Sequence, residues 1–156
     1  MAFNRRCIAD QQSGFADWVR ALYEGELALR EAGASLSDQE LQALFAPDVQ
    51  KLREQAHNRV PPAGEPEGPI LDLLFGWGAL PNRPIMLLDV KLAGDKTAVI
   101  DLTIAGNPGT LTLSGRFDPL MKSWQIDDID YGPGGPDRTL RGRLQRMATW
   151  PKRTAQ

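Results

Sequence analysis

The sequence is poor in the residues that metal and redox sites need. It has one cysteine, Cys7, and one histidine, His57, among 156 residues. A single cysteine excludes an intramolecular disulfide and a cysteine metal cluster, and a single histidine excludes a site built from two. We therefore predict no cofactor and no metal site, and we interpret Cys7 as a structural or incidental residue.

Long apolar runs and catalytic motifs are also missing. No run approaches the roughly 20 apolar residues of a membrane span, and residues 1–12 lack the apolar stretch of a signal peptide. The chain as written indicates a cytoplasmic protein, or a periplasmic one whose signal peptide was removed; both alternatives stay open. No Gly-x-Gly-x-x-Gly, phosphate loop or Gly-x-Ser-x-Gly occurs, so no catalytic residue is assigned.

Charge is nearly balanced but unevenly placed. The 18 basic and 20 acidic residues give a net charge of -2, which does not indicate nucleic-acid binding. From position 138 onward every charge is positive. This end could dock on an acidic partner or an anionic lipid surface; alternatively, it is a solvated helix face with a frayed basic tail at 149–156.

The clearest helix signal lies near the N-terminus. Residues 1–12 are polar and are predicted to be flexible. Ser13 can cap a helix, and the apolar residues after it recur with a helical period. We expect this helix to end at Gly33, since glycine adopts the left-handed C-terminal conformation without strain. Its apolar residues include Phe15, Trp18, Val19, Leu22 and Tyr23.

Two short helices are predicted next. Ser37 and Glu40 have the spacing of a capping box that opens the first. Pro47 should interrupt it, because proline cannot donate the helical hydrogen bond, and the second helix is expected over 48–58. His57, near its end, is interpreted as a surface residue.

The segment 59–84 holds six of the twelve prolines. Residues 59–68 are predicted to form an exposed loop, whereas the apolar stretch 69–75 should pack on the core. Trp77 lies between two glycines. It is either a core plug or lid, or a contact to a ligand.

Residues 85–131 are typical of strands joined by tight turns, and such strands are antiparallel neighbours. The predicted strands cover 85–92, 97–104, 110–117 and 123–131, with turns at 94–96, 105–109 and 118–122. The more apolar side of the first strand, which we expect to face the core, carries Met86, Leu88, Val90 and Leu92.

Two irregularities and a final helix complete the prediction. Gly115 stands where a side chain should pack, which indicates a bulge that bends the sheet. The alternation of the last strand slips at Asp127-Asp128, which indicates a bulge or a strand end. Asp137 is predicted to cap a closing helix that Pro151 ends. The apolar side of that helix comprises Leu140, Leu144 and Met147.

This order of elements predicts an α+β fold. The long first helix should cover the apolar face of a bent antiparallel sheet, and a bent sheet covered in this way tends to leave a cavity at its open end. We expect one domain over 13–148, with a short C-terminal helix.

Several segments together resemble a bacterial family. They are Phe15-x-x-Trp18-Val19-x-x-Leu22-Tyr23, 44–49, 95–99, 124–129 and 140–144. The chain resembles a domain of unknown function, usually exported, within the nuclear-transport-factor-two-like superfamily of cone-shaped α+β domains. That superfamily includes steroid isomerases, dehydratases and many non-catalytic binding or adaptor domains, so the resemblance implies a fold more than an activity. The segment 59–84 departs from the pattern in being longer and richer in proline.

Five residues are predicted to bind a ligand in the cavity: Trp18, Tyr23, Trp77, Asp89 and Asp101. The two aspartates lie on neighbouring predicted strands. A carboxylate inside an apolar cavity could shuttle a proton, as in the isomerases that the fold resembles.

The acidic cluster of Asp127, Asp128 and Asp130 has two interpretations. Its oxygens could bind a hard cation such as calcium. Alternatively, the carboxylates are solvated and balance nearby arginines. No glycine turn of a calcium loop accompanies them, so we assign no metal.

The sequence favours a non-catalytic accessory module of a bacterium, which recognises a small apolar ligand or a protein partner through the sheet cavity and the 59–84 loop. A homodimer through the open sheet face is a further expectation. Two alternatives stay open: a small isomerase or lyase that uses a cavity carboxylate, and an immunity or inhibitor protein. Neither nucleic acid nor a membrane span is expected.

Overall fold

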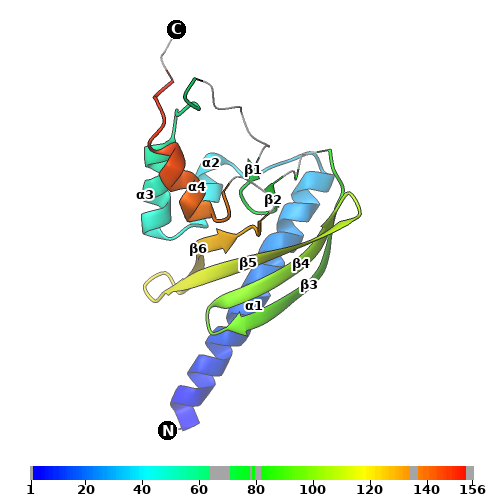
Figure 1. Ribbon diagram of the computed structural model, residues 1–156. Helices are drawn as coiled ribbons and strands as arrows, with labels where there is room; N and C mark the ends of the chain where they lie inside the picture. Colours follow the sequence, from blue (N-terminus) through cyan, green and yellow to red (C-terminus); the bar gives the residue numbers. More distant parts are fainter. Residues whose placement is uncertain (1, 64–70, 78, 80–81, 134–136, 154–156) are drawn as a thin grey trace.

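The structure is a computed structural model that describes residues 2–63, 71–77, 79, 82–133 and 137–153 (Figure 1). It has the predicted α+β order, with helices before the sheet and a short helix after it. The elements are α1 (Ala2–Glu31), α2 (Asp38–Ala43), α3 (Pro47–Ala56), β1 (Leu71–Asp72), β2 (Gly76–Trp77), β3 (Ile85–Gly94), β4 (Thr97–Ile104), β5 (Asn107–Asp118), β6 (Ser123–Asp130) and α4 (Leu140–Met147).

Helix α1 is longer than predicted. It begins at Ala2, so the predicted start at Ser13 is wrong; no glycine or proline interrupts the preceding residues, and a serine inside a helix costs little. The predicted end is confirmed. Gly33 has a φ of 69°, and the N–H of Ala34 donates to the carbonyl of Leu29 at 2.8 Å, as in a Schellman motif.

The two short helices follow the prediction. The Ser37 hydroxyl accepts the N–H of Glu40 at 3.1 Å, and the Glu40 side chain accepts the N–H of Ser37 in return. Pro47 is the first residue of α3, where its missing N–H costs no helical bond. Between the helices, the N–H of Ala46 donates to the carbonyl of Ile126 in β6 at 2.9 Å. The linker therefore covers the free edge of β6.

The main sheet has the strand order β3-β4-β5-β6, and all its pairs are antiparallel. The turn between β4 and β5 is shorter than predicted, because Ala105 and Gly106 both have positive φ, the geometry of a two-residue hairpin. Pro108 therefore lies in β5 rather than in the turn. Pairing with β6 starts only at Thr112, so Pro108 has a strand neighbour on one side only.

The expected core face of β3 is wrong. Leu87 pairs with Leu102 and Asp89 with Asp101, so that Leu88 has no partner and forms a bulge. The bulge changes which side chains point inward. Leu87 is half-buried, whereas Met86 and Leu88 are 62% and 56% exposed. Only Val90 of the predicted face is buried.

The bulge predicted near Gly115 is confirmed. Ser114 pairs with Asp128 and Gly115 with Ile126, so Asp127 is the extra residue, where the alternation slips. A Cβ atom on Gly115 would lie 2.5 Å from the ring of Phe15. Glycine therefore lets α1 approach the sheet, and the slip keeps the apolar residues of β6 on the core side.

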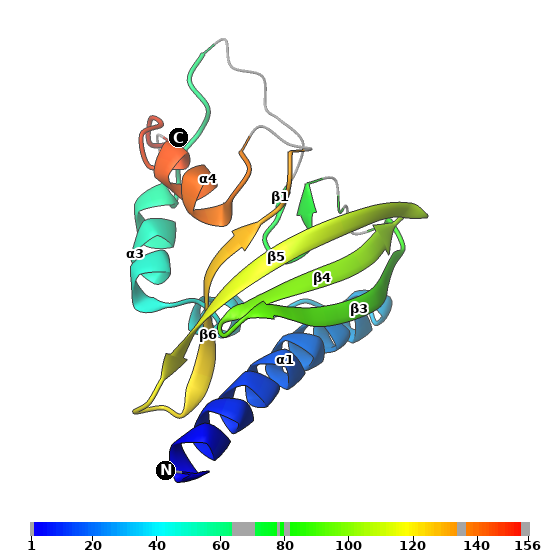
Figure 2. The same ribbon diagram turned by 60° about the horizontal axis from the view of Figure 1, so that its bottom comes forward.

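Helix α1 runs along the apolar face of the sheet, and α3 and α4 stand together beyond β6 (Figure 2). Phe15, Val19 and Tyr23 of α1 are fully buried. Phe15 packs on Trp124 of β6, with 4.6 Å between ring centroids. The predicted cover of the sheet by the first helix is confirmed.

The C-terminal segment is more ordered than predicted. Thr139, not Asp137, caps α4, because its hydroxyl accepts the N–H of Gly142 at 3.0 Å. After the helix, Trp150 is buried and Lys152 pairs with Arg59 in an antiparallel bridge. The frayed tail is therefore wrong for residues 150–153; residues 154–156, like the 64–70 part of the predicted loop, lie outside the described residues.

Candidate functional site

A cavity of ≈ 300 Å³, here called the sheet cavity, lies at the end of the sheet where β4 turns into β5. The ends of these strands form one wall and β2 forms another, so the cavity joins the sheet to the 59–84 segment as predicted. Its apolar lining comprises Phe75, Trp77, Leu102, Ile104, Leu111 and Tyr131. Arg83, Asn107 and Thr110 also line it and are exposed.

The wall from the 59–84 segment is held by hydrogen bonds. A carboxylate oxygen of Asp72 accepts the N–H groups of Leu74 at 2.9 Å and Phe75 at 3.0 Å. The Tyr23 hydroxyl donates to the carbonyl of Leu74 at 2.6 Å, and the Tyr131 hydroxyl donates to the preceding carbonyl at 2.6 Å. Burial raises the pKa of both tyrosines, so the hydroxyls remain neutral donors.

Leu74 and Phe75 are buried, which confirms that the apolar stretch packs on the core. Trp77 is half-buried: it packs against the core and also lies in the wall of the sheet cavity. Its ring lines the sheet cavity, and its Nε1 donates to the carbonyl of Asp137 at 2.8 Å. Contact of this ring with a ligand stays a prediction.

The other four predicted ligand residues do not line the sheet cavity. Trp18 packs half-buried beside Phe15, and Tyr23 lies in the core. Asp89 and Asp101 are direct neighbours across β3 and β4. Both lie on the face opposite the core, since their strand neighbours Val90 and Ile100 are buried.

Asp89 accepts a backbone hydrogen bond at the free edge of β3. Its carboxylate accepts the N–H of Val90 at 2.9 Å, while Arg20 of α1 donates to the Val90 carbonyl at 3.2 Å. Both backbone groups of Val90 are thus satisfied within the chain, which blunts an unpaired strand edge. Asp101 accepts a hydrogen bond from the Thr110 hydroxyl at 3.1 Å.

No Asp or Glu is among the described residues that line the sheet cavity. The described part of the chain also has no buried charged side chain. The isomerase or lyase alternative required a carboxylate in this cavity. It has no such group among the residues that the structure describes.

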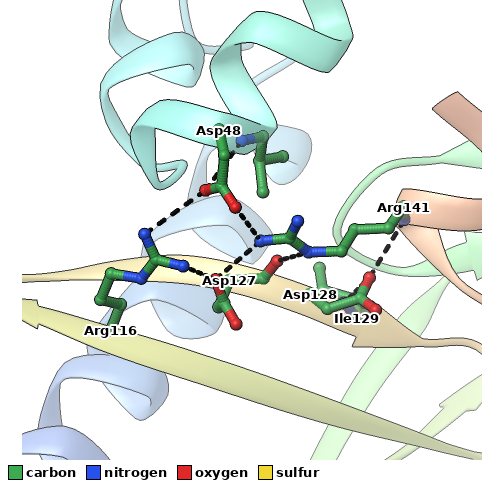
Figure 3. A network of polar contacts seen from close by, with 7 residues as sticks. Asp48, Arg116, Asp127, Asp128, Ile129 and Arg141 are labelled. Carbon is green, nitrogen blue, oxygen red and sulfur yellow. Dashed lines mark hydrogen bonds and ion pairs between the residues drawn. The ribbon is translucent and has the colours of Figure 1, made fainter. Parts of the chain in front are cut away.

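Arginines pair with the acidic cluster in an ion network of Asp48, Arg116, Asp127 and Arg141 (Figure 3). Nη2 of Arg141 lies 2.8 Å from Asp48 and 2.7 Å from Asp127. Arg116 reaches the same two carboxylates at 3.5 and 2.8 Å. The interpretation as acids balanced by arginines is therefore confirmed for Asp127. No group of three metal-ligating side chains occurs among the described residues.

The pKa values of two aspartates, one in the network and one beside it, are shifted in opposite directions. The hydrogen bond from Arg141 lowers the pKa of Asp48. Burial raises the pKa of Asp128, although this carboxylate accepts the backbone N–H groups of Ile129 and Arg141. Asp130 pairs separately with Arg138 at 3.0 Å.

A second hollow of ≈ 460 Å³, here called the arginine hollow, lies between the ends of α3 and α4. The predicted surface position of His57 is confirmed, and it lies on this rim. The described lining comprises Arg53, Ala56, His57, Asn58, Arg59, Leu73, Arg143, Leu144, Met147 and Arg153. Sequence reasoning missed this site, because its two halves lie far apart in the chain; the basic C-terminal end was its only signal.

Comparisons with known proteins add no relative. A scan against protein-family models, a search of curated proteins and a search of solved structures each returned no match. Among the described residues, no helix combines the length and apolarity that crossing a membrane requires. A function must therefore be argued from the two hollows themselves.

Proposed function

We propose that the protein is a non-catalytic binding module that holds a small apolar ligand in the sheet cavity. The observation that carries the proposal is that the polar atoms of the aromatic lining are already used. Trp77 donates to Asp137, and Tyr131 donates to the carbonyl of Leu73. Besides the exposed side chains of Arg83, Asn107 and Thr110, what remains for a ligand is ring faces and aliphatic side chains, which reward burial of apolar surface.

The size and setting of the cavity support the same proposal. Its volume of ≈ 300 Å³ suits a compact ligand, at the lower end of the usual range for small-molecule sites. The lack of a described carboxylate in its lining favours binding over proton transfer. The helix over an antiparallel sheet also supports the proposed kinship with the nuclear-transport-factor-two-like superfamily.

The test is a titration with the neutral apolar fluorophore N-phenyl-1-naphthylamine. Gly109 pairs with Leu102, and a Cβ there would lie 3.6 Å from the Leu102 side chain, an ordinary contact. Gly109→Leu should therefore fill the cavity without displacing the backbone. We expect saturable binding to the native protein and about tenfold weaker binding to this variant, a loss of about 1.4 kcal/mol.

The matched control is Thr112→Leu, on the same strand but paired with Val99 on the opposite face. It should bind the fluorophore like the native protein. Equal binding by all three proteins, or none by the native one, would contradict the proposal.

A further inference from the structure

The arginine hollow carries positive charge without matching acids. Arg53, Arg59, Arg143 and Arg153 line it, and no described lining residue is Asp or Glu. Only Arg143 forms an ion pair with a described carboxylate, that of Asp137 at 3.2 Å. A concave wall whose arginines outnumber the described carboxylates paired with them concentrates positive potential, even in a chain of net charge -2.

Neighbouring groups hold three of these four guanidinium groups in place, those of Arg53, Arg59 and Arg143. The Arg143 guanidinium lies between two indole rings, 5.1 Å from the centroid of Trp77 and 4.9 Å from that of Trp150. Arg59 donates to the carbonyls of Gln55 at 3.2 Å and Trp150 at 2.7 Å. These bonds use two of its five N–H donors. Positions that are already fixed lower the entropy cost of binding an anion.

Arg53 is held in the same way. Its guanidinium lies 5.1 Å from the ring centroid of Phe45 and donates to the side chain of Gln42. Burial lowers the pKa of this arginine, which shows that its charge is only partly hydrated. An anion that reached it would replace water that the protein already restricts.

The rest of the described wall combines the polar His57 and Asn58 with four apolar residues. Ala56 and Leu144 are each 5% exposed, and Leu73 and Met147 pack half-buried against the core. The volume of ≈ 460 Å³ falls within the range of small-molecule sites. A bare inorganic anion would leave this apolar surface in contact with water.

We propose that the arginine hollow binds a small amphipathic oxyanion, a carboxylate or phosphate group carried on a short apolar body. The guanidinium groups donate to the oxyanion, as arginine does to both headgroups, while the body covers Ala56, Leu144 and Met147. This site is separate from the sheet cavity, whose proposed ligand is apolar and uncharged.

The experiment is calorimetric titration of the full chain at low salt with octanoate, octyl phosphate, 1-octanol and inorganic phosphate. We expect at least one of the two amphipathic anions to bind saturably, and the stronger of them identifies the headgroup. 1-Octanol and inorganic phosphate should bind at least about tenfold more weakly, because the alcohol lacks the anionic headgroup and inorganic phosphate lacks the apolar body. Binding by 1-octanol or inorganic phosphate as tight as by the anions would overturn the proposal.

A further arm separates a free ligand from a membrane surface. Vesicles of anionic phosphatidylglycerol should not compete with the amphipathic anion. If the protein binds these vesicles but neither octyl anion, the hollow is part of a lipid-docking surface and the proposal is wrong.

Variants locate the binding. Arg153 is exposed, and its side chain pairs with no described carboxylate, so Arg153→Gln should leave the fold intact. This variant should bind the amphipathic anion about five- to tenfold more weakly than the native protein. Arg138→Gln removes the same charge from an exposed arginine outside the hollow and should change binding less than twofold. Equal weakening by both variants would show long-range attraction instead of a site. Arg153→Gln should bind N-phenyl-1-naphthylamine normally, so the two proposals can fail independently.

Discussion

The helices α3 and α4 form two arginine-rich regions, which differ in how many of the arginines are paired with described carboxylates. At their first turns, Arg141 and Asp48 belong to the ion network, in which each arginine has a carboxylate (Figure 3). Toward their last turns, four arginines line the arginine hollow, one of them pairs with Asp137, and no described lining residue is an acid. Acids are favoured at helix starts and cations at helix ends, because the helix dipole attracts each. In this chain the rule applies to Arg53 in the last turn of α3, whereas Arg141 in the first turn of α4 is compensated by the carboxylates of Asp48 and Asp127.

The difference predicts what each arginine does. In the network, the charges are satisfied within the chain, so their role is to join α3, the sheet and α4. In the hollow, donors are left over, so their role is to bind something else. Removing an arginine should cost stability in the first region and ligand affinity in the second.

The largest expected effect is that of Arg141→Gln. Arg141 donates to two carboxylates and, through Nε, to the carbonyl of Asp127 at 2.7 Å. Because these are hydrogen bonds to charged or partly buried groups, the free energy of unfolding should fall by about 1–3 kcal/mol. The measurement is the midpoint of urea unfolding.

Its matched control is Arg138→Gln. Arg138 pairs with Asp130, but its side chain is 64% exposed, so this pair should contribute less than about 0.5 kcal/mol. Identical midpoints for the two variants would remove the distinction between a stabilising network and an ordinary surface pair.

A smaller effect is expected from pH. The folded-state pKa of Asp48 is lowered, so its contribution to stability is present above the unfolded pKa of about 3.9 and is lost as pH falls through the folded value. Asp48→Asn should therefore be less stable than the native protein near neutral pH and should lose less stability on acidification. Urea midpoints measured between about pH 3 and 7 test this.

Asp128 should show the opposite sign. Its folded-state pKa is raised, so its contribution is present below about 3.9 and is lost as pH rises through the folded value. Asp128→Asn keeps an oxygen that can accept the two N–H groups, and it should lose no stability near neutral pH. If both variants shifted the dependence of stability on pH in the same direction, the opposite pKa shifts assigned to Asp48 and Asp128 would be incorrect.

The smallest effect on stability belongs to the hollow. Arg153→Gln should change the free energy of unfolding by less than about 0.5 kcal/mol, because the hydrogen bond that this residue forms within the described part of the chain is from its backbone N–H to the carbonyl of Asn58, and the substitution keeps it. Urea unfolding next to Arg141→Gln checks this. A loss as large as that of Arg141→Gln would mean that both regions are structural and that the comparison fails.

Local chemistry made much of the fold predictable. The capping box at Ser37, the helix end at Gly33 and the break at Pro47 each depend on a few adjacent residues, and all three are confirmed. The bulge at Asp127, opposite Gly115, also left a mark in the sequence, because it interrupts an otherwise regular alternation.

The predictions were wrong where a local sequence pattern is compatible with more than one structure. Met86 and Leu88 are apolar, but a bulge at Leu88 turns them outward, and nothing in β3 alone announces it. Among the five predicted ligand residues, Trp77 lines the sheet cavity. Asp89 does not, and it lies on the face opposite the core, the side on which the alternation of the sequence places it.

The sequence by itself determined the end of α1, the capped start of α2 and the break before α3, since caps, glycines and prolines act on their immediate neighbours. Only the tertiary structure decided which arginines have acids beside them. Asp48 meets Arg141, and Arg59 meets Trp150, across about 90 residues of chain. Coulomb attraction and hydrogen bonding depend on distance in space, and packing of α3 against α4 sets that distance.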